Sequence, residues 1–120
     1  MPAQRPPILH CLTPASQSKI RLIDVNAPNP NPIVSVIVLN YNGANWIERC
    51  LTSLKTQTIF EESEVIVADN LSTDGSDALA TRVVEKWPRG VFMQHGQNLG
   101  YCAGNNRAAE RATGQYLLFL

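Results

Sequence analysis

Apolar residues of this chain gather into four short runs, each bounded by polar or glycine-rich segments. Runs without alternation, the first of them rich in β-branched residues, are typical of strands buried on both faces of a parallel sheet. The predicted strands are IVSVIVL at 33–39, EVIVAD at 64–69, VFMQH at 91–95 and the start of a fourth, YLLFL, at 116–120.

Between these runs, apolar residues recur at the spacing of one helix face. The stripe of the first predicted helix consists of Trp46, Ile47, Cys50, Leu51 and Leu54. The stripe of the second consists of Leu79, Val83, Val84 and Trp87. We expect Pro88 to stop that helix. The third helix lies within NLGYCAGNNRAAERATG at 98–114, where Gly114 is expected to follow the last helical turn as its C′ residue.

Polar residues before two of these helices are candidate N-caps. Asn45, with Glu48 three residues later, makes a capping pair for the first helix. Ser72, Thr73 and Asp74 offer N-caps for the second, and capping is the expected role of Ser72 and Asp74.

The order of these elements predicts an α/β fold with an open, mostly parallel sheet and alternating helices. Right-handed crossovers between parallel strands place helices on both faces of such a sheet. The arrangement is Rossmann-like. Because the last predicted strand has no following turn, we interpret the whole arrangement as the first half of a larger, truncated domain.

The first 32 residues differ from the rest in composition, since they carry seven of the eight prolines. Proline removes amide donors and biases the preceding residue toward extended backbone. We therefore divide the chain into an irregular or mobile Pro/Asn-rich arm at 1–31 and the α/β part at 32–120. Within the arm, KIRLIDV at 19–25 alternates well enough to form a short edge strand.

Composition narrows the function classes. The 120 residues make one domain at most, and the ten basic residues balance the ten acidic ones, so no footprint for nucleic acid or an anionic membrane surface follows. No apolar run approaches the ~20 residues of a membrane helix, and a signal-peptide h-region is absent. The three cysteines, Cys11, Cys50 and Cys102, form no CxxC pair, which favours a reduced, cytoplasmic setting without a zinc site.

Candidate chemistry lies in three loops. Ligands of open parallel sheets bind beyond the carboxyl ends of the strands, where this chain has LNYNGAN at 39–45, DNLSTDGS at 69–76 and HGQNLGYCAGNN at 95–106. These loops are rich in Asn, Asp, Ser, Gly and Tyr but poor in Lys and Arg. A diphosphate bound there would have to be balanced by helix N-termini and a metal ion.

Individual residues in these loops have a binding and a structural interpretation, which the sequence leaves open. Asp69, at the end of a strand, could accept from a base N–H or a ribose hydroxyl, or cap the amides of its own turn. Tyr41 could stack on a base and Asn42 could reach ribose or phosphate, whereas a tyrosine here is often half-buried packing.

The glycine-rich turn before the third helix has the same two interpretations. Its small and amide residues could cradle a pyrophosphate, or they could allow close helix–sheet packing. They are Asn98, Gly100, Gly104 and Asn105. His10 and His95 have no partner in the sequence, and a solvated or packed histidine is favoured for both.

Several enzyme classes lose support. GxGxxG is absent from the turn after the first strand, where Asn40 and Asn42 stand, and a Walker A loop is absent too. No Ser–His or Cys–His arrangement can be assembled. Oxidoreductase, P-loop and triad-hydrolase functions are therefore disfavoured.

Four segments in order and spacing resemble the family 2 glycosyltransferases, and in particular their rhamnosyltransferase-like branch. They are PIVSVIVLNYNGANWIERCLTSLKTQT at 32–58, VIVADNLSTDGS at 65–76, NLGYCAGNN at 98–106 and GQYLLFL at 114–120. The resemblance implies the GT-A type fold of nucleotide-diphospho-sugar transferases, a UDP-, GDP- or dTDP-sugar donor, and a glycan or lipid-linked glycan acceptor.

The resemblance also implies a nucleotide-binding role for seven positions. Asp69 would contact the base, and the Leu39 backbone and Tyr41 would line the base and ribose pocket with Asn42 beside them. Asn98, Gly100 and Asn105 would lie near the ribose and diphosphate.

Two parts of the family pattern are missing. The Asp-rich motif that binds a divalent cation (Mn or Mg) would follow a strand like YLLFL, so its ligands would lie beyond Leu120, and the catalytic base and acceptor site would lie later still. No residue here inherits a catalytic or metal-binding role. We expect the donor-nucleotide-binding half of a cytoplasmic enzyme, which in full length could be peripheral to the membrane, and no sugar transfer by the chain alone.

Two rival functions stay open. One is a non-enzymatic nucleotide-binding or interaction module whose exposed sheet edge docks a partner. The other is a nucleotidyltransferase, which would be expected to carry a glycine- and basic-rich loop after the first strand. In this chain the segment after the first strand is LNYNGAN, which is not a glycine- and basic-rich loop.

Overall fold

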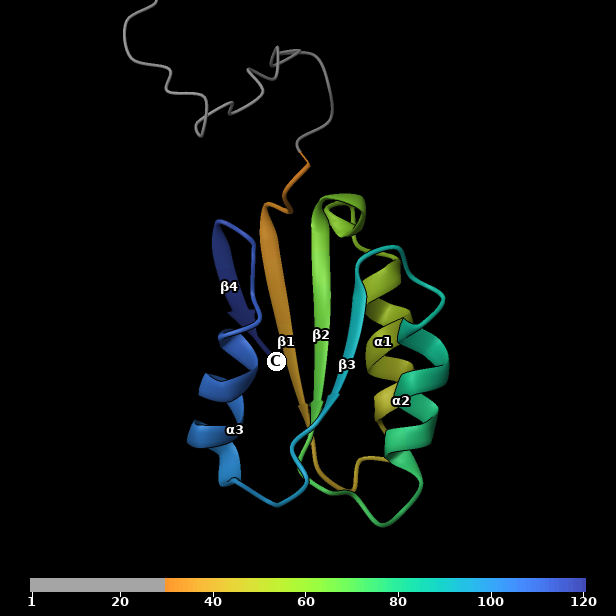
Figure 1. The fold of residues 1–120 in the computed structure, drawn as a ribbon. Helices are drawn as coiled ribbons and strands as arrows, with labels where there is room; N and C mark the ends of the chain where they lie inside the picture. The colour runs from red at the N-terminus through yellow and green to blue at the C-terminus, as the bar shows by residue number, and fades with distance from the viewer. Residues whose placement is uncertain (1–29) are drawn as a thin grey trace, which may run out of the picture.

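The computed structural model describes residues 30–120 as a sheet with helices on both sides (Figure 1). In chain order, the elements are β1 (Val34–Asn40), α1 (Ile47–Lys55), the 3₁₀ turn η2 (Phe60–Glu62), β2 (Ser63–Asp69), α2 (Ser76–Val84), β3 (Gly90–Gln94), α3 (Gly100–Ala109) and β4 (Tyr116–Phe119). Most of the predicted arm, its edge strand at 19–25, His10 and Cys11 lie outside the described residues.

The four strands form one parallel sheet in the order β3-β2-β1-β4. β1 pairs with β2 from Val34–Ser63 to Asn40–Asp69, so the carboxyl ends of these two strands are level. The predicted open, parallel α/β fold is confirmed, and the predicted strands agree with the observed ones to within one residue at every end.

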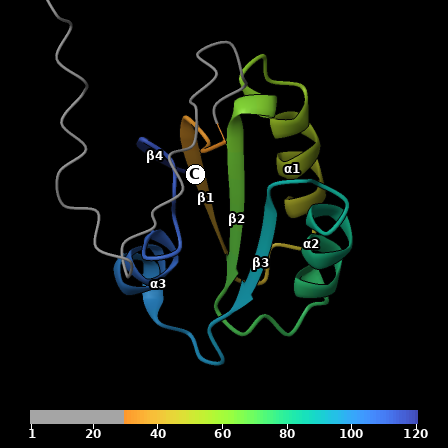
Figure 2. The same cartoon turned by 45° about the horizontal axis from the view of Figure 1, so that its top comes forward.

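Helices cover both faces of the sheet, α1 and α2 on one and α3 on the other (Figures 1 and 2), and each face has its own apolar core. Val36 and Val38 of β1 point toward α1 and α2, where they pack with Leu51. Ile37 points to the opposite face and packs with Ala108 of α3. Because successive side chains of a strand alternate between faces, burial on both sides requires the continuous apolar runs seen in the sequence.

The predicted capping pair of α1 is wrong. The helix begins at Ile47, the residue before it is Trp46, and no side chain caps it. The amides of Trp46 and Ile47 instead donate to the Gly43 carbonyl at 2.9 and 2.8 Å. A backbone carbonyl of the preceding turn therefore accepts from the amides at the helix start, the role that was predicted for the side chains of Asn45 and Glu48.

Two predicted helix ends are also displaced. α2 ends at Val84, before Pro88, although Trp87 is still buried and meets Phe60 edge-on at 5.0 Å between ring centres. α3 ends at Ala109, so Gly114 is not its C′ residue. Gly114 is small for another reason, since a Cβ there would lie 2.6 Å from Ser35 Oγ.

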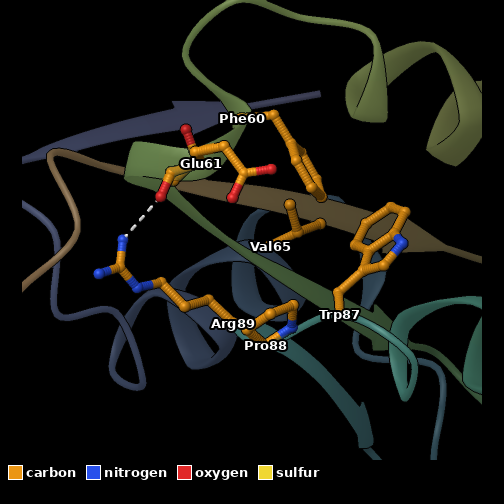
Figure 3. A pocket seen from close by; sticks show the side chains of 7 residues that line it. Phe60, Glu61, Val65, Trp87, Pro88 and Arg89 are labelled. Atoms are coloured by element: carbon orange, nitrogen blue, oxygen red, sulfur yellow. Dashed lines mark hydrogen bonds between the residues drawn. The ribbon is translucent and has the colours of Figure 1, made fainter.

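The amino end of the sheet carries a cavity of about 190 Å³ (Figure 3). Phe60, Trp87 and Pro88 form its apolar wall, and Arg89 Nη1 donates to the Glu61 carbonyl beside it at 3.0 Å. This cavity lies opposite to the three polar loops. Within residues 30–120, the helices are too short and too polar to span a bilayer.

Candidate functional site

The three polar loops meet at the carboxyl end of the sheet, the lower end in Figure 1. Ala44 N–H of the first loop donates to Asp74 Oδ2 of the second at 2.9 Å. Asn70 Nδ2 of the second loop donates to Asn98 Oδ1 of the third at 3.2 Å. Segments far apart in the sequence are therefore tied into one polar surface, as the position of these loops after parallel strands predicts.

A buried asparagine joins the first two loops. Asn40 is 4% exposed, and its Nδ2 donates to Asp69 Oδ1 at 2.7 Å and to Ser76 Oγ at 2.8 Å. It also reaches Ser72 Oγ at 3.1 Å. The sequence interpretation missed Asn40 as a structural residue, although its place at the end of a buried strand was a usable signal.

Asp69 is fully buried, and protein donors use both of its oxygens. Oδ2 accepts from Ser72 N–H and from Gln94 Nε2, both at 2.8 Å. Oδ1 accepts from Ser72 Oγ at 2.6 Å and from Asn40. Asp69 therefore stabilises its own turn, which was the alternative to contact with a base. A base N–H would have to share one of these oxygens or displace one of the protein donors.

The same contacts determine the charge of Asp69. Burial would raise its pKa, but the hydrogen bonds from Ser72, Gln94 and Asn40 outweigh burial and hold the pKa below its ordinary value. Asp69 is therefore ionised at neutral pH, with its charge satisfied inside the protein.

Neither Ser72 nor Asp74 is the N-cap of α2, because that position is Gly75, and only Asp74 reaches the helix start. Asp74 Oδ1 accepts from the N–H of Ser76, the first residue of α2, at 3.0 Å, so Asp74 does serve the start of that helix. Ser72 does not cap, because its hydroxyl donates to Asp69 and accepts from Asn42 N–H at 2.9 Å.

Tyr41 and Leu39 share the wall of a cavity of about 220 Å³ between α1 and the ends of β1 and β4. Tyr41 is 53% exposed, so its ring is available to a flat ligand. Leu120 lines the same cavity.

Asn42 is engaged within the loops. Its φ is +50°, in the left-handed region, and its Oδ1 accepts from Thr73 N–H at 2.8 Å. This bond adds to the connection between the first and second loops.

The turn before α3 depends on Asn98 and Gly100. Asn98 Oδ1 accepts from Gly100 N–H at 2.9 Å, and Gly100 has a φ of +75°, which favours glycine. Within α3, Gly104 lies against Leu39 and Asn70, since a Cβ there would be 2.9 Å from a Leu39 methyl carbon. Close packing therefore accounts for Gly104, whereas Gly100 shapes the turn.

Asn70 and His95 form a pair that the sequence did not indicate. Asn70 Nδ2 donates to the Gly100 carbonyl at 3.1 Å, so its Oδ1 is the atom that accepts from His95 Nδ1 at 2.8 Å. Burial lowers the pKa of His95 and the Arg107 charge lowers it further, against a smaller effect of Asp69. His95 is a neutral, packed histidine, as expected, but it has a partner.

Asn105 lies on the buried side of α3 and is 4% exposed. Its Nδ2 donates to the Tyr101 carbonyl at 3.0 Å, and its Oδ1 is one of two buried side-chain atoms without a partner among residues 30–120. The other is His95 Nε2. Asn105 thus faces the protein interior and not the open polar surface.

Positive charge and metal ligands are scarce in this region. No group of three or more His, Cys, Asp or Glu side chains is arranged to hold a metal ion within the described residues.

Comparison with known proteins places this arrangement in a family. The family described as "Glycosyl transferase family 2" matches residues 35–120. The chain is 37% identical over 87 residues to the uncharacterized glycosyltransferase YibD of Escherichia coli, covering 72% of this chain and 25% of YibD. It is 33% identical over 90 residues to glycosyltransferase AglE of Haloferax volcanii, covering 74% of this chain and 30% of AglE.

Solved structures show the same likeness in three dimensions. The mannosyltransferase PcManGT of Pyrobaculum calidifontis, in complex with GDP-Man and Mn²⁺, matches with a TM-score of 0.66 and 32% identity, over 72% of this chain and 26% of PcManGT. TarS 1-349 of S. aureus in complex with UDP-GlcNAc matches with a TM-score of 0.66 and 32% identity, over 72% of this chain and 25% of TarS 1-349.

The chain spans between a quarter and a third of the length of these relatives. The family match nevertheless covers most of this chain, residues 35–120, and includes all three loops of the polar surface. This chain therefore belongs to glycosyl transferase family 2.

Proposed function

We propose that this chain is the donor-nucleotide-binding half of a glycosyltransferase that transfers a sugar from a nucleotide-diphospho-sugar to an acceptor hydroxyl. The observation that carries the proposal is the meeting of three polar loops at the carboxyl end of the sheet, in a chain that is similar to solved structures holding GDP-Man or UDP-GlcNAc. Ligand binding at this end is the general behaviour of open parallel sheets.

The base and ribose are assigned to the cavity beside β1. The exposed ring of Tyr41 supplies a stacking surface, and Leu39 lies in the same cavity wall. Asn42 holds the adjoining loop through Thr73. Asp69 would contact the base only if a base N–H shared one of its oxygens with the protein donors or replaced one of those donors, which makes it the most demanding of these assignments.

The diphosphate is assigned to the start of α3. Asn98 and Gly100 shape the turn there, and the N-terminal amides of a helix attract anions. Asn105 is proposed near the diphosphate as well, although its side chain faces inward, so its contribution would be to the shape of α3.

Charge balance at the diphosphate needs more than these groups. When bound, a divalent cation (Mn or Mg) would supply electrostatic stabilisation of the leaving diphosphate. We place its ligands, and the catalytic base, in sequence that follows β4 in a longer family member. The residues of this chain bind and orient the donor, and none is assigned a catalytic role.

The finer identity of the enzyme is also a proposal. The segment NLGYCAGNN at 98–106 supports the rhamnosyltransferase-like branch. The donor would be a UDP-, GDP- or dTDP-sugar and the acceptor a glycan or lipid-linked glycan. We place the enzyme in the cytoplasm, with a peripheral position at the membrane open to the full-length protein.

Thermal unfolding with UDP, GDP and dTDP, each with and without Mn²⁺, tests the donor half. Binding to the native state alone adds about 2.7 kcal/mol of stability at a hundred times Kd, so one nucleotide should raise Tm. Tyr41→Ala should reduce this rise, whereas Tyr116→Ala, at another exposed tyrosine, on β4 (66% against 53% for Tyr41), should leave it intact. A panel without any shift would contradict the proposed site.

A non-enzymatic interaction module is the second candidate. Every residue at 116–120 is apolar and 41–66% exposed, which suits a surface that another polypeptide covers. The coding sequence after Leu120 separates the two functions, since an Asp-rich motif there supports the glycosyltransferase and a stop codon supports the module.

A further inference from the structure

A buried carboxylate lies on the α3 face of the sheet, at the end opposite to the candidate site. Glu64 stands near the start of β2 and is 8% exposed. Its neighbour in the register is Ser35 of β1. Both side chains lie on the face that carries Ile37 and Ile66, because they are two residues away from them along their strands.

The donors that reach Glu64 in the described part of the chain are all neutral, and most belong to the turn between α3 and β4. Oε1 accepts from Thr113 N–H at 2.5 Å and from Gly114 N–H at 3.3 Å. Oε2 accepts from the Thr113 hydroxyl at 3.1 Å, and Ser35 Oγ donates to Oε1. We call these four residues, Ser35, Glu64, Thr113 and Gly114, the Glu64 cluster.

The cluster holds the turn tightly against β1. Gly114 N–H also donates to Ser35 Oγ at 2.8 Å, and a Cβ at Gly114 would lie 2.7 Å from the Ser35 backbone nitrogen. Any residue larger than glycine would push the turn away from the strand. Two positions later, Tyr116 begins β4 opposite Val34.

β4 itself offers little to determine where it pairs. Its four residues are all apolar and all exposed, so its two faces are alike. A strand of this kind has a weakly specified register, because a shift along its neighbour leaves similar side chains in every position. Only the pairs from Val34–Tyr116 to Ile37–Phe119 join it to the sheet.

We propose that Glu64 is a positioning residue that fixes the register of β4 on β1. By binding the turn at Thr113 and Gly114, the carboxylate decides which residue of the apolar run first meets Val34. At the far end of β4, Leu120 lines the cavity of Tyr41 and Leu39, so Glu64 also determines where this wall stands. That last consequence rests on the proposed function, whereas the register does not.

Residue-resolved amide hydrogen exchange on the 120-residue chain tests the proposal. Tyr116 N–H donates to the Ile33 carbonyl and Leu120 N–H to the Ile37 carbonyl, both at 3.0 Å, so these amides report on the two ends of β4. Asn70 N–H, which donates to the Asn40 carbonyl at 2.9 Å, reports on the β1–β2 pair.

Glu64→Ala should accelerate exchange of both β4 amides by about tenfold or more relative to that of Asn70, since several hydrogen bonds to a charged group are lost. Cross-strand NOEs between Val34 and Tyr116 should weaken or be joined by a second set. Glu64→Gln keeps an acceptor oxygen and should restore part of the protection. Glu62→Ala, at an exposed carboxylate two residues earlier, is the matched control and should change nothing.

Equal acceleration of all three amides would show that Glu64 contributes only to global stability, and unchanged exchange would show no role; either result overturns the proposal. Should Glu64→Ala fail to fold by circular dichroism, Thr113→Ala and Ser35→Ala are judged by the same criterion. None of these measurements uses a nucleotide, so a failure of the proposed function would leave their outcome unaffected.

Discussion

At the scale of single residues, some polar side chains of the candidate site are buried and hold the loops together, whereas others are exposed to solvent. Asn40, Asp69 and Asn70 are 4%, 0% and 2% exposed, and their side chains hold the three loops in place. Tyr41 remains open to solvent. Of the residues that the family resemblance associates with the nucleotide, Asp69 is thus a buried supporting residue and Tyr41 an exposed one, and substitutions should separate them.

Asp69→Ala should lower the free energy of unfolding by about 2–4 kcal/mol, because it leaves the buried amide of Asn40 and the partly buried hydrogen bonds from Ser72 and Gln94 without their acceptor. Urea denaturation measures the change. Glu85→Ala, at an exposed carboxylate just after α2, is the control and should stay within about 0.5 kcal/mol of the parent. A loss as small as that of the control would show that the Asp69 contacts are energetically minor.

Acid should destabilise the fold through Asp69 and Glu64. Burial alone would raise the pKa of Glu64, but hydrogen bonds from Ser35, Thr113 and Gly114 hold it below its ordinary value. The pKa of Asp69 is held below its ordinary value in the same way, by the donors of that residue. The unfolded chain then binds more protons, so this stability is complete above the unfolded pKa of about 4 and is lost as pH falls through the folded pKa.

Urea titrations between pH 7 and pH 3 measure this loss. Glu64→Gln removes one of the two titrating groups, so the decline of its stability with acidification should be shallower than that of the parent. Parallel curves for the two proteins would assign the acid sensitivity to other groups.

At the scale of elements, helix ends are where local patterns and tertiary contacts disagree. α1 begins on a backbone turn and not on a capping side chain, and α3 ends well before Gly114. Two glycines at the ends of this segment are therefore required for different reasons. Gly100 is required by its backbone conformation, with a positive φ, and Gly114 by its close contact with Ser35.

These two requirements predict different costs. Gly100→Ala meets no atom within 4 Å but has a φ of +75°, so it should destabilise by about 1 kcal/mol. Gly114→Ala would overlap the Ser35 backbone and should cost more, about 2–3 kcal/mol. Chemical denaturation of both variants gives the order, and a reversed order would contradict the close packing of Gly114 against Ser35.

At the scale of the whole described molecule, burial is uneven across the sheet. β2 is buried along its full length, whereas β4 is exposed along its own. An apolar edge strand with unpaired backbone groups is a template for association. The described part of the protein therefore combines a well-packed interior with an exposed apolar edge strand, β4, that favours association.

Leu117→Lys should reduce self-association of the 120-residue chain, because charge on an edge strand opposes pairing with another chain. Leu117 is 48% exposed, so the unfolding free energy should change by less than about 1 kcal/mol. Sedimentation velocity over a concentration series measures the association. Identical profiles for parent and variant would show that β4 is not the contact surface.

The amino-acid sequence by itself determined the order of strands and helices and the convergence of three loops. Continuous apolar runs result from burial on both faces, and the carboxyl ends of parallel strands share one edge of the sheet. The same patterns predicted a packed role for His95, which the structure contains, whereas the predicted N-cap Asp74 is replaced by Gly75 and only accepts from the first N–H of α2.

Only the tertiary structure decided which polar side chains turn inward. Asn40 and Asp69 are 29 residues apart, as are Ser35 and Glu64, so no local pattern reveals that each pair meets. Their partners are brought together by strand register, a long-range property. The physical reason is that a buried polar group must be hydrogen-bonded, and the fold alone selects the donor that satisfies it.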